Sequence, residues 1–157
     1  MTDMKRRTLL KGTLAFGALG MAFSAGLLTP RAALAAWPQG AFEAKSVDDA
    51  LKALFGSTQL EGNDKINIKL PEIAENGAVV PVSVEVAMDG VESISILAEK
   101  NPTPLTSSYT LNAATEPFVS TRIKLGKTTS VIAVVKAGGK LHSAGKEVKV
   151  TIGGCGG

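Results

Sequence analysis

The stretch Val80-Pro81-Val82-Ser83-Val84-Glu85-Val86 places a valine at every second position. Because side chains of a β-strand alternate between its two faces, this period of two predicts a strand with one buried face. Pro81 has no N–H to donate to a neighbouring strand, so we expect a sheet edge or a bulge where this strand begins. The stretch therefore predicts a β-rich fold with a core of aliphatic side chains.

Similar short runs, separated by turn residues, follow and precede this strand. We expect strands at 66–70, 93–98, 107–111, 118–125, 130–137 and 146–152, with turns at 76–77, 89–90, 101–104 and 126 and a two-residue hairpin turn at Gly138-Gly139. About seven short strands at this spacing predict an all-β, immunoglobulin-like antiparallel β-sandwich. The single cysteine excludes a disulfide within the domain, so the likeness to antibody domains is one of architecture.

One helix is expected before the strands, over 46–56. Ser46 suits the N-cap position, Asp48 and Asp49 suit the first turn, and Gly56 suits the position after the helix. Its apolar residues fall on one face, so we expect the helix to cover the body of the domain as a lid. They are Val47, Ala50, Leu51 and Leu54.

The first residues have the features of an export signal. Arg6 and Arg7 precede an apolar run over 12–28, and the small-residue segment 32–36 provides an A-x-A cleavage site after Ala35 or Ala36. The pattern resembles signals of the twin-arginine (Tat) class, although Lys5 and Leu9 depart from the usual S/T-R-R-x-F-L-K. The alternative, a membrane anchor, is disfavoured because the run is short and rich in glycine.

This signal defines three parts of the chain: a Tat signal peptide over 1–35, a β-sandwich over 36–152 and an arm over 153–157. We expect a periplasmic protein with no membrane attachment after cleavage. Because the Tat route exports folded proteins, and this small chain carries no cofactor motif, we also expect export as a complex with a partner subunit.

Most of the excess positive charge lies in the signal. Residues 1–35 contain five Lys and Arg against one acidic residue, which leaves 12 basic and 13 acidic residues and a net charge of −1 in the rest. Nucleic-acid binding needs a basic surface that this balance does not supply. The sequence therefore favours partners other than nucleic acid.

The chain ends in Gly153-Gly154-Cys155-Gly156-Gly157, which contains its only cysteine. Glycines on both sides of Cys155 predict a flexible, slender arm that carries the sulfur roughly 10 Å beyond the last expected strand. In an oxidising compartment, a lone cysteine indicates an intermolecular disulfide or a reactive free thiol. The arm is therefore the candidate functional site, with Cys155 as its reactive residue.

Cys155 has no sequence neighbour that would activate its thiol, so the sequence favours a carrier on which other proteins act over an enzyme. Alternatives are an Ig-like interaction module crosslinked through Cys155, a ubiquitin-like sulfur carrier and an independent thiol oxidoreductase. His142 is interpreted as a solvated edge residue, and a role as base for Cys155 is a weaker hypothesis. The acidic residues are assigned to helix capping and loops, and no metal or cofactor site is expected; they are Asp48, Asp49, Glu72 and Glu75.

The twin-arginine signal, the β-rich domain and the GGCGG terminus at 153–157 together resemble SoxY, the sulfur-carrier family of the thiosulfate-oxidising Sox multienzyme system. The resemblance implies that Cys155 carries sulfur intermediates covalently. It implies a heterodimer with a SoxZ-type subunit, and transient docking to a c-type cytochrome, a sulfate-releasing hydrolase and a sulfane dehydrogenase. By the same resemblance, the chain has no catalytic activity of its own.

Overall fold

The computed structural model describes residues 38–151. The expected signal over 1–35, with Arg6 and Arg7, and the expected arm over 153–157 lie outside the described residues. The elements are α2 (Gln39–Glu43), α3 (Val47–Phe55), β1 (Glu61–Gly62), β2 (Ile66–Lys69), β3 (Ile73–Ala74), β4 (Val80–Val86), β5 (Val91–Ala98), β6 (Leu105–Thr110), β7 (Phe118–Ile123), β8 (Thr129–Ala137) and β9 (Lys140–Val150).

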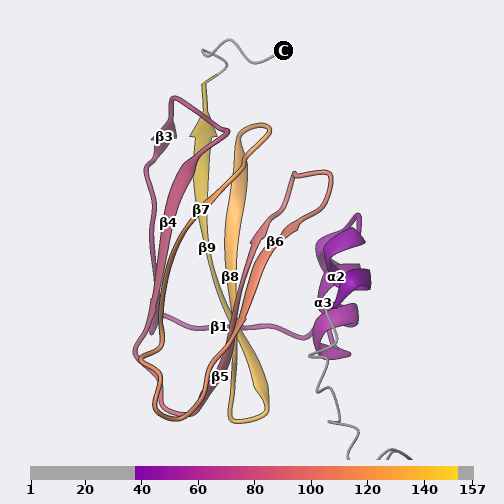
Figure 1. Ribbon diagram of the computed structural model, residues 1–157, viewed down its shortest axis with the longest axis vertical. Helices are drawn as coiled ribbons and strands as arrows, with labels where there is room; N and C mark the ends of the chain where they lie inside the picture. The colour runs from indigo at the N-terminus through magenta and orange to yellow at the C-terminus, as the bar shows by residue number, and fades with distance from the viewer. Residues whose placement is uncertain (1–37, 152–157) are drawn as a thin grey trace, which may run out of the picture. The chain divides into compact units, whose positions relative to one another are not determined.

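The strands form two sheets, which confirms the predicted sandwich (Figure 1). The larger sheet has the order β1-β9-β8-β5-β6, with β3 also paired to β9, and the smaller has the order β2-β4-β7. Pairing is antiparallel except for β1 and β3, which each make a short parallel pairing with β9. These two parallel pairings were not expected from the sequence, because each strand has only two residues.

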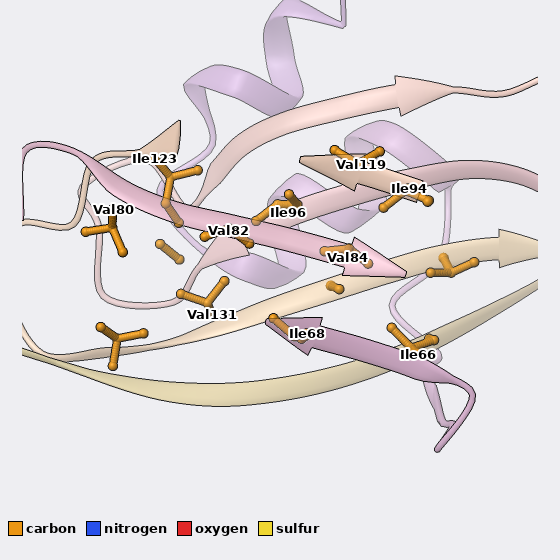
Figure 2. Packing of buried hydrophobic residues seen from close by; sticks show 14 of the residues in the cluster. Ile66, Ile68, Val80, Val82, Val84, Ile94, Ile96, Val119, Ile123 and Val131 are labelled. Atoms are coloured by element: carbon orange, nitrogen blue, oxygen red, sulfur yellow. The ribbon is translucent and has the colours of Figure 1, made fainter. Parts of the chain in front are cut away.

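The predicted valine face of β4 forms the centre of the core between the sheets. Val80, Val82 and Val84 are fully buried, and Val86 is 4% exposed. Figure 2 shows Val80, Val82 and Val84 among Ile94 and Ile96 of β5 and Val131 of β8. Aliphatic burial of this kind stabilises the fold by roughly 1.5–3 kcal/mol per large side chain. The strand predicted from these alternating valines is confirmed and ends at Val86.

Pro81 is accommodated without a bulge in β4. β4 lies in the middle of its sheet, but β2 ends opposite Ser83, at Lys69, so only β7 pairs with β4 at Pro81. The missing N–H therefore falls where the strand has one neighbour. This local edge is what the proline predicted, although the strand as a whole is central.

The largest difference in strand boundaries concerns β9, which begins at Lys140 and not at the expected Lys146. The hairpin turn is confirmed: Gly138 and Gly139 have φ of 57° and 76°, and Ala137 pairs with Lys140 directly across it. Because the turn is tight, the chain pairs with β8 immediately after it, and β9 therefore begins at Lys140. The first half of β9 shows no clean alternation in sequence, and its burial is irregular too, with Leu141 buried and the next three residues half-buried.

The helix predicted at 46–56 is confirmed at both ends. Ser46 Oγ accepts a hydrogen bond from Asp49 N at 3.1 Å, and Gly56 adopts a left-handed φ of 71° while its N–H bonds to Lys52 O. Sequence reasoning missed α2, a single short turn of helix without a capping side chain. None of the helices within 38–151 is long and apolar enough to cross a membrane.

Both helices pack on the outer face of the larger sheet, beside β6 in Figure 1. Leu51 of α3 and Ala41 of α2 lie against Leu97, Leu105 and Val134, and all five are at most 3% exposed. This second, smaller core confirms that the helix acts as a lid. It also leaves the smaller sheet without a helical cover in the described part of the chain.

Candidate functional site

Cys155 and its four flanking glycines, Gly153, Gly154, Gly156 and Gly157, lie outside the described residues. The structure does describe the point from which the chain runs toward them, which is the end of β9 followed by Thr151 (Figure 1). We use the name arm base for residues 148–151 together with the two segments that bond to them, 72–78 and 125–129.

Hydrogen bonds hold the arm base from one side through β3. Lys149 N donates to Glu72 O at 2.9 Å, and Thr151 N donates to Ala74 O at 3.2 Å. These two hydrogen bonds belong to the parallel pairing of β3 with β9, in which Ile73 pairs with Lys149 and Ala74 with Val150. The backbone is therefore fixed up to the last described residue.

The other side of the arm base is held by the start of β8. Val150 N donates to Thr128 Oγ1 at 3.0 Å, and Val148 pairs with Thr129. A side-chain hydroxyl thus continues the ladder one residue beyond the strand pairing. Together with β3, it means that Val150 is flanked on both sides.

Gly77 allows these segments to approach one another closely. Leu125 N donates to Gly77 O at 2.7 Å. A Cβ atom at this glycine would lie 2.8 Å from Val150 Cγ1 and would also meet Leu125 O. The sequence predicted a turn at Asn76-Gly77, and Asn76 does form one, accepting from Ala78 N at 2.9 Å. The packing requirement at Gly77 was not visible in the sequence.

The surface beside β3 is partly apolar. Ile73 is 56% exposed and Val79 51% exposed, and both line a shallow groove of about 270 Å³ with Pro71 and Pro81. Charged side chains lie on the neighbouring surface of β9, where Lys146 and Lys149 line a second groove with Glu72.

The four acidic residues that the sequence assigned to helix capping and loops do lie in a helix cap and in loops. Asp48 and Asp49 are exposed in the first turn of α3, and Asp49 Oδ2 accepts from Ser46 Oγ at 2.7 Å. Glu72 and Glu75 are exposed beside β3. Within 38–151, no group of three or more His, Cys, Asp and Glu side chains is close enough to hold a metal ion.

The interpretation of His142 as a solvated edge residue is wrong. Its side chain is only 15% exposed, because β9 lies between β8 and β1 at this point. Nδ1 lies 3.5 Å from Asn63 Nδ2 and 3.8 Å from Glu61 Oε2. The short strand β1, which the sequence did not reveal, is what covers it.

His142 is also too far along β9 to act as a base for Cys155 of the same molecule. It precedes Val150 by eight residues in a continuous strand, which corresponds to about 26 Å at ~3.3 Å per residue. The four steps from Thr151 to Cys155 span at most ~14 Å when extended. The two groups therefore cannot meet.

The family model described as "Sulfur oxidation protein SoxY" matches residues 51–155. The chain belongs to the SoxY family. This match runs from α3 through the whole sandwich and includes the position of Cys155. It confirms the family resemblance drawn from the sequence.

Solved structures agree with membership of the SoxY family. The sulfur carrier protein SoxY from Chlorobium limicola f thiosulfatophilum is 46% identical, with a TM-score of 0.63; the match covers 68% of this chain and 97% of that one. A superoxide reductase (neelaredoxin) from Ignicoccus hospitalis is 19% identical, with a TM-score of 0.50 and coverage of 68% and 93%, so it shares the fold alone. Comparison with curated protein sequences found no significant match.

Proposed function

We propose that this SoxY-family chain is a periplasmic sulfur carrier, which holds thiosulfate-derived sulfur on Cys155 and presents it to partner enzymes until it is released as sulfate. The observation that carries the proposal is the family match, which extends to residue 155 and so spans the only cysteine. The relative at 46% identity is itself described as a sulfur carrier protein.

The proposed cycle begins with oxidative coupling of thiosulfate to the Cys155 thiol. A sulfur–sulfur bond forms, one proton leaves, and two electrons pass to a c-type cytochrome partner, giving a cysteine S-thiosulfonate. A hydrolase then adds water, cleaves the terminal sulfone as sulfate and leaves a persulfide. A sulfane dehydrogenase oxidises the outer sulfur to a sulfonate, with three waters supplying the oxygens and six electrons leaving. A second hydrolysis releases sulfate and restores the thiol.

In this scheme the chain supplies no catalytic group. The sequence neighbours of Cys155 are glycines, so the cations or bases that lower a thiol pKa would come from the partners. Gly153, Gly154, Gly156 and Gly157 would keep the segment narrow enough to enter enclosed sites. Each docking must be brief, because ordering such a segment costs ~1–2 kcal/mol per residue.

The geometry of the arm base supports a chain that carries the sulfur while its partners supply the catalytic groups. Hydrogen bonds from both sides hold the backbone up to Thr151, so the proposed arm would begin from a fixed point. A fixed origin limits the volume that Cys155 can sweep. This raises its effective concentration at an enzyme docked nearby.

Export by the Tat route as a heterodimer with a SoxZ-type subunit completes the proposal. Arg6 and Arg7 would direct export. Prior assembly in the cytoplasm would explain why a small cofactor-free chain uses a route for folded proteins.

The intact mass of the protein purified from thiosulfate-grown cells tests the central claim. We expect sulfane, thiosulfonate or sulfonate adducts that disappear with reductant, and none in the Cys155→Ser variant, whose circular dichroism should be unchanged. A protein that carries only a Cys155 disulfide between two chains would contradict the proposal and favour the crosslinked interaction module.

Gly154→Val tests the role of the narrow arm. A branched side chain next to Cys155 should leave the fold intact and slow thiosulfate-dependent electron transfer in a reconstituted system, because the segment becomes wider and stiffer. The matched control is Gly62→Val in β1, where nothing lies within 4 Å of an added Cβ. Equal rates for wild type and Gly154→Val would remove this role for the glycines.

A further inference from the structure

The sandwich is open along the side formed by β6 and β7. β6 is the last strand of the larger sheet and β7 the last strand of the smaller one, so each has a strand neighbour on one side only. Such an edge presents backbone N–H and C=O groups that another strand can pair with. On the opposite side, by contrast, β9 is flanked by β1 and β3.

A groove of about 620 Å³ runs between these two open strands. Ile123 of β7 lines it and is 5% exposed, whereas Leu105 of β6, also at the groove, packs its side chain beneath the helices on the outer face of the larger sheet. The wall therefore combines two strand edges with one apolar side chain from the core between the sheets. This is the kind of surface that holds an extended peptide.

Two hydroxyl side chains face into this groove from opposite sheets. Ser107 pairs with Ile96 and Thr121 pairs with Val82, and both partners are fully buried in the core between the sheets. Directly paired residues share a face, so Ser107 and Thr121 also point inward. Ser107 Oγ is shielded from solvent and makes no hydrogen bond within the described structure. Since buried hydroxyl groups in folded proteins are normally hydrogen-bonded, a ligand could supply the missing partner.

The rim of the groove is positively charged. Arg122 and Lys124 of the β7 segment are exposed, and neither makes an ion pair within 38–151. No acidic residue lines the groove. The chain from residue 36 carries a net charge of −1, so the positive charge at this groove differs from the charge balance of the chain as a whole.

We propose that this groove binds an extended acidic segment of another protein, which adds a strand to the free edge of β7. Arg122 lies in β7 and Lys124 follows its last residue, Ile123, so both charges lie at the same end of this edge. The added strand would place acidic side chains opposite them, and its alternate side chains, small and hydroxyl-bearing, would face Thr121 and Ser107. This inference does not depend on the chemistry of Cys155.

A small anion fits the same surface less well. Sulfate or phosphate would use the charges of Arg122 and Lys124 but would leave most of a groove of about 620 Å³ empty. It would also leave the edge of β7 unpaired and make no use of the apolar wall.

Titration of the ¹⁵N-labelled full-length protein with a synthetic eight-residue peptide of alternating glutamate and threonine tests the proposal. We expect amide shifts confined to residues 101–107 and 119–126, weakening with salt. Arg122→Glu combined with Lys124→Glu should reduce affinity by roughly tenfold or more, because attraction becomes repulsion. Lys65→Glu is the matched control, an exposed charge reversal outside the groove, and should leave the affinity unchanged.

Ser107→Ala separates binding from folding. Removing a hydroxyl that has no partner should leave the unfolding midpoint unchanged or raised, while peptide affinity falls by roughly two- to tenfold. Equal binding of a lysine–threonine peptide, or shifts outside the groove, would overturn the proposal. So would sodium sulfate or thiosulfate saturating the same amides at concentrations at which the peptide does not, since that would make the groove a small-anion site.

Discussion

At the scale of single residues, Gly77 shows how one position can couple three segments. Its carbonyl bonds to Leu125 N, and its missing Cβ makes room for Val150 and for the backbone of Leu125. The need for glycine here comes from close packing of the chain, because its φ is not positive. The end of β9 therefore depends on a residue far from it in sequence.

Replacing Gly77 by alanine should destabilise the protein by about 1–3 kcal/mol, because the new methyl group forces the Leu125 backbone or β9 to move. Urea unfolding measures the change. Hydrogen exchange at Val150 and Thr151 should also become faster, since their neighbours shift. Gly62→Ala, with open space around the new Cβ, is the control and should have little effect. Equal stability of the two variants would contradict the packing account.

Glu92 is the one acidic group within 38–151 for which a pKa shift is resolved. A hydrogen bond from Lys136, whose Nζ lies 2.7 Å from Glu92 Oε2, lowers the pKa of Glu92 below its ordinary value of 4.5, and the Gly139 N–H adds to this. Because the pKa of Glu92 is lower in the folded state than in the unfolded state, the interaction stabilises the protein fully at pH values above the unfolded-state pKa. Its contribution is lost as pH falls through the folded-state pKa.

Lys136→Met should therefore raise the pKa of Glu92 toward 4.5, measured by NMR titration of its carboxyl carbon. The control Lys52→Met, on α3, should leave that pKa where it is. If the Glu92 pKa did not move in Lys136→Met, the salt bridge between β5 and β8 would not be its cause.

At the scale of elements, the lid of α2 and α3 is stabilised mainly by burial. α3 has nine residues, too few for a stable isolated helix, so its cap at Ser46 needs the support of tertiary packing. That packing is on Leu97, Leu105 and Val134, which the larger sheet turns outward. A register shift between Ile96 and Leu97 in the pairing of β5 with β6 accompanies the outward placement of Leu97.

Leu51→Ala should reduce the free energy of unfolding by about 2–5 kcal/mol, because it opens a cavity between α3 and the sheet. Lys52→Ala, on the exposed face of the same helix, should stay within roughly 0.5 kcal/mol of wild type. Chemical denaturation of both variants checks this. A small effect at Leu51 would show that the lid contributes little to the stability of the sandwich.

At the scale of the whole molecule, the two sides of the sandwich differ in the larger sheet, while β2 and β7 are both edge strands of the smaller sheet. β9 is the longest strand and pairs with β1, β3 and β8, while β6 and β7 each keep a free edge. The β6–β7 groove and the arm base adjoin at Gly126, which lines the groove and belongs to the 125–129 segment of the arm base.

The twin-arginine export predicted from Arg6 and Arg7 is also tested on the whole molecule. Replacing Arg6 and Arg7 together by lysine should keep the precursor in the cytoplasm, because the predicted Tat signal depends on the arginine pair. Arg31→Lys, outside that motif, is the control and should be exported normally. Cell fractionation followed by immunoblotting measures the distribution, and an unchanged periplasmic fraction in the double variant would exclude the twin-arginine route.

The sequence alone determined the features that depend on local chemistry. Alternation of valines placed β4, the cap residues Ser46 and Gly56 bounded α3, and two adjacent glycines specified the β8–β9 turn. The family was also readable, since the GGCGG terminus needs no fold to be recognised. These signals succeed because each depends on the conformational preference of a few neighbouring residues.

Only the tertiary structure decided which distant segments meet. β1 and β3 are two-residue strands that exist because β9 offers them backbone partners, and β1 is the reason that His142 is covered. The constraint on Gly77 and the inward-facing hydroxyl of Ser107 likewise arise from neighbours far away in sequence. Long-range pairing and close packing leave no periodic trace in the sequence, because they depend on which surfaces the folded chain brings together.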